Sequence, residues 1–251
     1  DLYPFQEKCL TTFKDNRYNI ILKARQLGIS TLSAGYSLWM MLFHNDKNIL
    51  VIATGKETAK NLVTKVRVMY EGLPQWLKTN TEEINKLSIR FANGSQIKAI
   101  ASNESAGRSE ALSLLIIDEA AFIDRIDTIW TAAQQTLSTG GGCIALSTPN
   151  GVGNWFHKQW LGAEEGTNQF NTIRLHWTDH PDRDQVWRDE QDKILGPSQA
   201  AQECDTDFLS SGRSVVDPAI LQWYKEEMIE APIEEIGIDR GLWVWRQPDY
   251  T

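Results

Sequence analysis

The sequence predicts an α/β fold in which a mainly parallel sheet is covered by helices on both faces. Apolar runs alternate with helical patterns through the first two-thirds of the 251 residues. The runs lack the polar alternation of a half-exposed strand, so both faces of the sheet are expected to be buried. Composition agrees, because 41% hydrophobic and 23% charged residues are typical of a chain with a substantial core.

The predicted elements follow one another in chain order. A helix begins at Pro4, a residue favoured in the first turn. Short apolar runs predict strands over residues 19–24, 48–54, 112–122, 142–148 and 170–177. Helical patterns cover residues 30–45, 57–73, 127–138 and 154–163. An Asn93-Gly94 turn within residues 87–101 predicts a hairpin.

The pattern changes after about residue 180. Two charged segments, residues 182–195 and 217–230, read as short helices with no strand between them. We therefore expect a core domain over residues 1–208 and a small helical lid or linker over residues 209–251.

Charge and cysteine content limit the possible functions. A net charge of −8 counts against a chain that grips DNA over its whole surface, although a local basic patch is compatible with it. The three cysteines are far apart and form no C-x-x-C pair, which argues against structural zinc and a disulfide framework. No apolar run approaches the roughly 20 residues of a membrane-spanning helix.

The stretch NIILKARQLGISTLSAG, residues 19–35, has the form of a phosphate-binding loop between a strand and a helix. The usual loop places Lys directly before its Ser or Thr, but Ile29 stands there. Lys23 and Arg25 are the two candidates for the missing charge. The alternative is an ordinary strand–turn–helix junction. The residues assigned to nucleotide binding in this stretch are Lys23, Arg25, Gln26, Leu27, Gly28, Ile29, Ser30 and Thr31.

Two further strands end in polar residues. Asp118 and Glu119 follow LLII, the form of a Walker B segment, in which the first acid holds magnesium and the second acts on the attacking water. Ser30 is the second candidate magnesium ligand. Ser147 and Thr148 end another buried strand, where hydroxyls can sense the terminal phosphate. Acids that merely cap a strand and an ordinary Ser-Thr-Pro turn are the alternatives.

Three residues outside these segments are further candidates. Gln6, about one helix before the loop, suits the edge of an adenine ring, and Phe5 suits its face. Both also fit a simple helix N-terminus. Arg108 lies in a Gly-containing loop, where it is either a solvated side chain or an arginine finger.

Together, YPFQ, KARQLGIST, SAGRSEALSLLIIDEAAF and ALSTPNG resemble the ATPase domain of the large terminase subunit of tailed bacteriophages, most strongly over residues 19–151. Some family members carry the loop lysine at the start of the loop, which is the position of Lys23. The resemblance therefore favours Lys23 as the replacement, with Arg25 as a second cation on the phosphates.

The resemblance implies a P-loop NTPase that hydrolyses ATP with Mg²⁺ and moves double-stranded DNA into a procapsid. It implies that Gln6 contacts adenine and that Ser30 and Asp118 hold Mg²⁺. Glu119 is the expected catalytic acid, supported by Arg25 and Arg108. Ser147 and Thr148 are the expected coupling motif.

The same resemblance implies partners and a place of action. These are double-stranded DNA, the portal protein and the small terminase subunit, in the cytoplasm of the infected host cell and transiently on the portal. A ring of identical copies is expected when the machine is assembled, and a monomer is expected in isolation. The family's nuclease domain is expected to be absent, so no nuclease activity is predicted; Asp205 and Asp207 are the best remaining acids.

Two other functions remain open from the sequence. A helicase-like ATPase shares the same motifs but normally needs a second motor domain. A nucleotide-binding regulator that no longer hydrolyses ATP is compatible with the altered loop.

Overall fold

The computed structural model describes residues 2–101, 111–209, 234–236 and 242–244, and the chain divides into two compact units, Asp1–Ser211 and Gly212–Thr251. In the described part of the second unit, β9 (Glu234–Ile236) and β10 (Leu242–Val244) pair antiparallel. The helix predicted over residues 217–230 lies outside the described residues. That this unit acts as a lid or linker stays a prediction.

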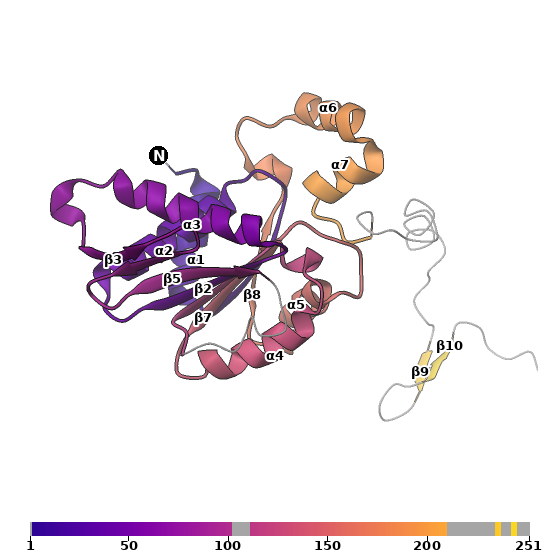
Figure 1. Cartoon of the computed structure of the whole chain (residues 1–251). Coiled ribbons are helices and arrows are strands. Elements are labelled where there is room, and N and C mark those ends of the chain that lie inside the picture. The colour runs from indigo at the N-terminus through magenta and orange to yellow at the C-terminus, as the bar shows by residue number, and fades with distance from the viewer. Residues whose placement is uncertain (1, 102–110, 210–233, 237–241, 245–251) are drawn as a thin grey trace, which may run out of the picture. The chain divides into compact units, whose positions relative to one another are not determined.

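The first unit is built on an eight-stranded sheet with the order β3-β4-β5-β2-β6-β7-β1-β8 (Figure 1). The strands from β5 to β8 in this order are parallel to one another, whereas β3 and β4 pair antiparallel. The prediction of a mainly parallel sheet is confirmed. The strand bounds are Tyr18–Lys23 (β1), Asn48–Ala53 (β2), Thr81–Ile84 (β3), Ser88–Phe91 (β4), Gln96–Ala101 (β5), Leu114–Asp118 (β6), Gly142–Ser147 (β7) and Asn171–Leu175 (β8).

Helices cover both faces of this sheet, as predicted (Figure 1). On one face lie α1 (Pro4–Asp15), α2 (Ile29–Phe43) and α3 (Lys56–Glu71), and on the other α4 (Ile126–Leu137) and α5 (Trp155–Glu164). Successive strand residues point to opposite faces, so Ile21 joins the core under α1, α2 and α3 while Ile20 and Leu22 join the core over α4 and α5.

The strand predicted over residues 112–122 is shorter in the structure. β6 ends at Asp118 because Glu119 has a left-handed backbone, with φ of 55°. The segment Ala120–Phe122 forms a 3₁₀ turn (η2) instead of continuing the strand. This break turns the Glu119 side chain away from the ladder, a backbone strain typical of functional positions.

After β8 the chain forms two helices, α6 (Gln185–Leu195) and α7 (Pro197–Cys204), with Gly196 between them at φ of 81°. The first was predicted and the second was not. Both Asp205 carboxylate oxygens accept hydrogen bonds from Arg188 at 2.8 Å, which ties the end of α7 to α6. The remaining short elements are the 3₁₀ turns η1 (Gln75–Leu77) and η3 (Trp177–Asp179).

Two features of the side chains complete the fold. All three cysteines, Cys9, Cys143 and Cys204, are buried free thiols. In the described part of the chain, no helix combines the length and the apolar character needed to cross a membrane.

Candidate nucleotide-binding site

The site forms where the carboxyl ends of β1, β7 and β6 lie side by side. Leu22 is paired with Ser147 across β1 and β7, and Leu146 with Asp118 across β7 and β6. Lys23, the last residue of β1, opens a loop that leads into α2. Parallel α/β sheets bind ligands at this edge, so the topology brings the predicted segments to one place.

The loop before α2 is held in a fixed shape by two left-handed residues and one glutamine. Gln26 has φ of 60° and Gly28 has φ of 77°. The Gln6 side chain donates through Nε2 to the Leu27 carbonyl at 3.1 Å, and its Oε1 accepts from the Tyr3 N–H. A Cβ added to Gly28 would stand 2.9 Å from Gln6 Nε2, so glycine permits this close approach. Here the amide of Gln6 anchors the loop; its contact with adenine stays a prediction.

A polar pocket of about 300 Å³ opens beside this loop. Every loop residue assigned to nucleotide binding from the sequence lines it. Its lining residues are Lys23, Arg25, Gln26, Leu27, Gly28, Ile29, Ser30, Thr31, Lys65 and Glu119. Lys65, from α3, was not predicted, because a lysine on an amphipathic helix gives no local signal beyond that of a solvated face.

Ser30 and Asp118 meet at the pocket, as predicted for a pair of metal ligands. Ser30 Oγ donates to Asp118 Oδ1 at 3.2 Å, and Asp118 is only 6% exposed. Burial, with the neighbouring Glu119 charge, raises the pKa of Asp118, while Lys23, the Ser30 hydrogen bond and Lys65 act against that rise. Carboxylate and hydroxyl oxygens are ligands that Mg²⁺ takes beside nucleotide phosphates and water, so these residues fit the ion.

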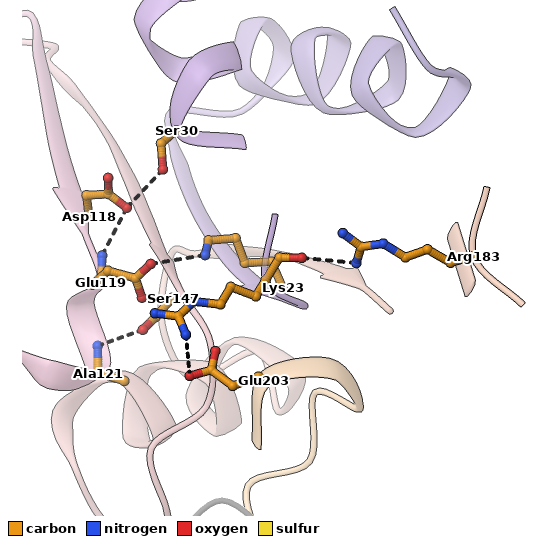
Figure 2. Close-up of polar contacts among 9 residues, drawn as sticks. Lys23, Ser30, Asp118, Glu119, Ala121, Ser147, Arg183 and Glu203 are labelled. Carbon is orange, nitrogen blue, oxygen red and sulfur yellow. Dashed lines mark hydrogen bonds and ion pairs between the residues drawn. The ribbon is translucent and has the colours of Figure 1, made fainter. Parts of the chain in front are cut away.

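Glu119 lies next to Lys23. The Lys23 Nζ atom is 3.2 Å from Glu119 Oε1, and Figure 2 shows Ser30 and Lys23 pointing toward the two neighbouring acids. The Lys23 side chain is 6% exposed and that of Glu119 is 32% exposed. The pair places a buried cation and a more accessible carboxylate at the pocket.

Arg25 is held from outside the loop by α7. Its Nη1 lies 3.1 Å from Glu203 Oε1, and its backbone N–H donates to the Glu203 carbonyl at 2.7 Å. Arg183 donates to the carbonyl oxygens of Arg25 and Gln26 at 3.0 and 3.2 Å, and its guanidinium lies 4.4 Å from the Trp187 ring centre. Sequence reasoning missed Glu203 and Arg183, since only the fold brings α6 and α7 to the loop.

The end of β7 is joined to the segment after Glu119. Ser147 and Thr148 are buried, and Ser147 Oγ accepts from the Ala121 N–H at 3.2 Å. Asn150 donates to the Ala121 carbonyl at 3.0 Å. The predicted coupling motif therefore contacts the chain two residues beyond the predicted catalytic acid.

A second, mostly apolar pocket of about 370 Å³ shares Gly28 and Thr31 with the first. Its lining residues are Leu2, Gln6, Leu10, Gly28, Thr31, Leu32, Gly35, Tyr36 and Met69. Among the described residues that line it, Tyr36 is the aromatic one, whereas the Phe5 ring stacks on Tyr3 with centroids 5.7 Å apart. Stacking of Phe5 on a base stays a prediction, and Arg108 lies outside the described residues.

Comparison with known proteins identifies the family. A family model described as terminase large subunit, T4likevirus-type, N-terminal, matches residues 20–217. The probable terminase large subunit gp28 of Escherichia phage Mu is 26% identical over 168 residues, which are 61% of this chain and 30% of that protein. The chain therefore spans less than a third of the length of that relative.

Solved structures share the fold. The large terminase ATPase domain of Thermus phage P74-26 is 23% identical, with a TM-score of 0.61 over 77% of this chain and 89% of that one. The large terminase of bacteriophage HK97 is 18% identical, with a TM-score of 0.62 over 91% and 48%. The large terminase of a thermophilic bacteriophage, in complex with ATP-gamma-S, is 14% identical, with a TM-score of 0.63 over 81% and 52%. This chain belongs to the terminase large-subunit family, and its described core is the N-terminal α/β unit of that family.

Proposed function

We propose that the chain is the ATPase motor domain of a DNA-packaging terminase, which hydrolyses ATP with Mg²⁺ to move double-stranded DNA into a procapsid. One observation carries the proposal: Lys23, Ser30 and Glu119 line a single pocket beside a left-handed glycine turn at the start of α2, and Ser30 is hydrogen-bonded to Asp118. Membership of the terminase large-subunit family supports it.

The triphosphate would bind along the loop. Backbone N–H groups at the N-terminus of α2 favour anions, and Lys23 and Arg25 add positive charge at the same pocket. The apolar pocket beyond Gly28 has the character expected of a base site. The large terminase of the thermophilic bacteriophage has been solved with ADP and with ATP-gamma-S, which supports a nucleotide as the ligand of this fold.

Ser30 and Asp118 would hold the magnesium ion. When bound, the ion neutralises charge that develops on the phosphates. The buried Asp118 carboxylate, already bonded to Ser30, supplies an oriented oxygen ligand without first having to lose a full hydration shell.

Glu119 would orient the attacking water and accept its proton. The Lys23 ammonium, 3.2 Å from Glu119 Oε1, holds this carboxylate in place at the pocket. Ser147 accepts from the N–H of Ala121, and Asn150 donates to the carbonyl oxygen of the same residue. A shift of the Glu119 segment during hydrolysis would be passed to β7 through these bonds, which is the coupling role proposed for Ser147 and Thr148.

The proposal includes the assembled machine. Its partners are DNA, the portal protein and the small terminase subunit, with copies arranged in a ring in the host cytoplasm. Arg108 is proposed as a finger on the nucleotide. If it acts on a neighbouring copy, mixing Arg108→Ala with Glu119→Gln subunits should restore part of the turnover. Mixed rings without any rescue would contradict the trans role.

The decisive experiment is ATP turnover by the chain with and without Mg²⁺. We expect hydrolysis that stops with EDTA and falls at least about 100-fold in Glu119→Gln, with nucleotide binding retained. Glu190→Gln, an exposed acid on α6, is the control. An undiminished rate in Glu119→Gln would remove Glu119 from catalysis.

The same assay tests the alternatives. Nucleotide binding without turnover would favour the regulator, and strand separation in the absence of a capsid would favour the helicase. The predicted lack of nuclease activity is tested with supercoiled plasmid and Mg²⁺ or Mn²⁺. Both carboxylate oxygens of Asp205 accept hydrogen bonds from Arg188. If the chain nicks plasmid, we therefore expect other acids to hold the metal ions.

A further inference from the structure

The three cations that line the phosphate pocket differ in their partners. Lys23 is paired with Glu119 and Arg25 with Glu203. Lys65 forms no ion pair or hydrogen bond with any residue in the described part of the chain. Among the described residues, the pocket therefore contains one lysine that makes no direct contact with an acid, although its charge acts on the nearby Asp118.

Helix packing explains why Lys65 reaches this pocket. Met69 lies one turn after Lys65 on α3 and packs against α2 at Gly35. A Cβ added to Gly35 would stand 3.7 Å from Met69 Sδ. Residues four apart lie on the same helix face, so Lys65 projects one turn nearer the start of α2. There it lines the pocket together with Ser30 and Thr31.

Ile29 occupies the place where the usual loop carries its lysine. We propose that Lys65 adds a third cation to this pocket, beside Lys23 and Arg25, and binds the terminal phosphates of the nucleotide. The inference rests on the proposed function, because it assumes that the pocket takes a triphosphate. It adds a phosphate ligand from α3, which comes after α2 and β2 in the chain.

The lack of an acid partner within the described part of the chain is what makes Lys65 suited to this role. Lys23 and Arg25 must share or give up a carboxylate before they can bond fully to a phosphate. Lys65 has no bonded carboxylate to release among the described residues, so its charge is available to the incoming nucleotide at lower cost. A charge-assisted bond of this kind is worth about tenfold or more in affinity.

Lys65→Met tests the inference, because it keeps the aliphatic stem and removes the charge. Dissociation constants for ATP-gamma-S, ADP and AMP are measured by calorimetry, and thermal unfolding without nucleotide reports on folding. Lys60→Met is the matched control, since Lys60 lies on the same helix and pairs with Glu57 at 2.8 Å. We expect Lys65→Met to bind ATP-gamma-S about tenfold more weakly, with AMP unchanged, and Lys65→Arg to recover most of the loss.

Two results would overturn the role of Lys65 alone. One is an ATP-gamma-S affinity in Lys65→Met equal to that of the unmutated chain. The other is an equal loss for all three nucleotides, which would indicate a disturbed α2–α3 contact and no phosphate contact. If the unmutated chain binds no nucleotide, the proposed function fails and the inference fails with it.

Discussion

The two ion pairs of the phosphate loop are built in opposite ways. In Lys23–Glu119 the cation is buried, with the Lys23 side chain 6% exposed and that of Glu119 32% exposed. In Arg25–Glu203 the cation is open to solvent, with the Arg25 side chain 63% exposed and that of Glu203 12% exposed. The two cations are two residues apart, but Lys23 ends a central strand and Arg25 lies in the turn beyond it.

The two pairs show how one loop combines a fixed charge, that of the buried Lys23, with a more mobile one, that of the exposed Arg25. Lys23 has little water around it, so the Glu119 carboxylate takes the place of water as the partner of its ammonium group. Arg25 remains hydrated, and an exposed pair of this kind is worth only about 0–1 kcal/mol. Burial raises the pKa of Glu203 while Arg25 opposes that rise, so Glu203 depends on Arg25 more than Arg25 depends on Glu203. Four predictions test this contrast.

The largest effect is expected for Lys23→Met. Removing the buried cation takes away the proposed phosphate ligand and the partner of the proposed catalytic acid, so ATP turnover should fall at least about 100-fold. Steady-state hydrolysis measures this, with Lys158→Met, an exposed lysine on α5, as the control. Turnover within a few-fold of the unmutated chain would show that the fixed cation is not Lys23.

The next effect is on folding without nucleotide. Glu119→Ala leaves the Lys23 charge buried and without its nearest anion, so we expect a loss of about 2 kcal/mol in the free energy of unfolding. Lys23→Met leaves Glu119, which water can still reach, and should cost about half as much. Urea denaturation measures both. A larger loss in Lys23→Met would mean that the carboxylate is the dependent partner.

Arg25→Ala should affect binding and spare folding. We expect about tenfold weaker ATP-gamma-S binding from the lost charge–phosphate contact. The free energy of unfolding without nucleotide should change by less than about 0.5 kcal/mol. A large stability loss with unchanged affinity would make Arg25 a structural link to α7 and remove it from the phosphates.

The smallest effect is expected for Glu203→Gln. The substitution keeps the shape of the side chain but releases the Arg25 charge, so ATP-gamma-S should bind about threefold more tightly. Calorimetry with Glu190→Gln as the control measures this. Weaker binding would mean that Glu203 holds Arg25 in its binding position and does not compete with the phosphates for it.

Local patterns were sufficient to predict the sheet and most of the pocket. The parallel strands are uninterrupted apolar runs, and the acids, hydroxyls and glycine turn that follow them are contiguous with those runs. Asp118 therefore meets Ser30 as expected, because the carboxyl ends of neighbouring parallel strands share one edge.

The remainder depends on information that no local window contains. β3 has the sequence Thr-Glu-Glu-Ile with all four residues exposed, so it lacks any apolar pattern. α7 is only eight residues long and begins at the proline of a Gly-Pro pair, which on its own is typical of a turn. Lys65, Glu203 and Arg183 reach the pocket from α3, α7 and the approach to α6, and only the packed fold reveals those contacts.

The position of Cys204, at the last residue of α7 and directly after Glu203, gives the chain a built-in chemical reporter. Cys204 is 3% exposed, and burial raises the pKa of its thiol. While α7 stays packed against the loop, an alkylating reagent therefore cannot reach the sulfur, and little of the reactive thiolate is present. The rate of its modification then measures how often α7 leaves the phosphate loop. Cys143, within the central strand β7, provides the slow reference on the same molecule. If a bound nucleotide draws Arg25 away from Glu203, the labelling rate of Cys204 should change relative to that of Cys143.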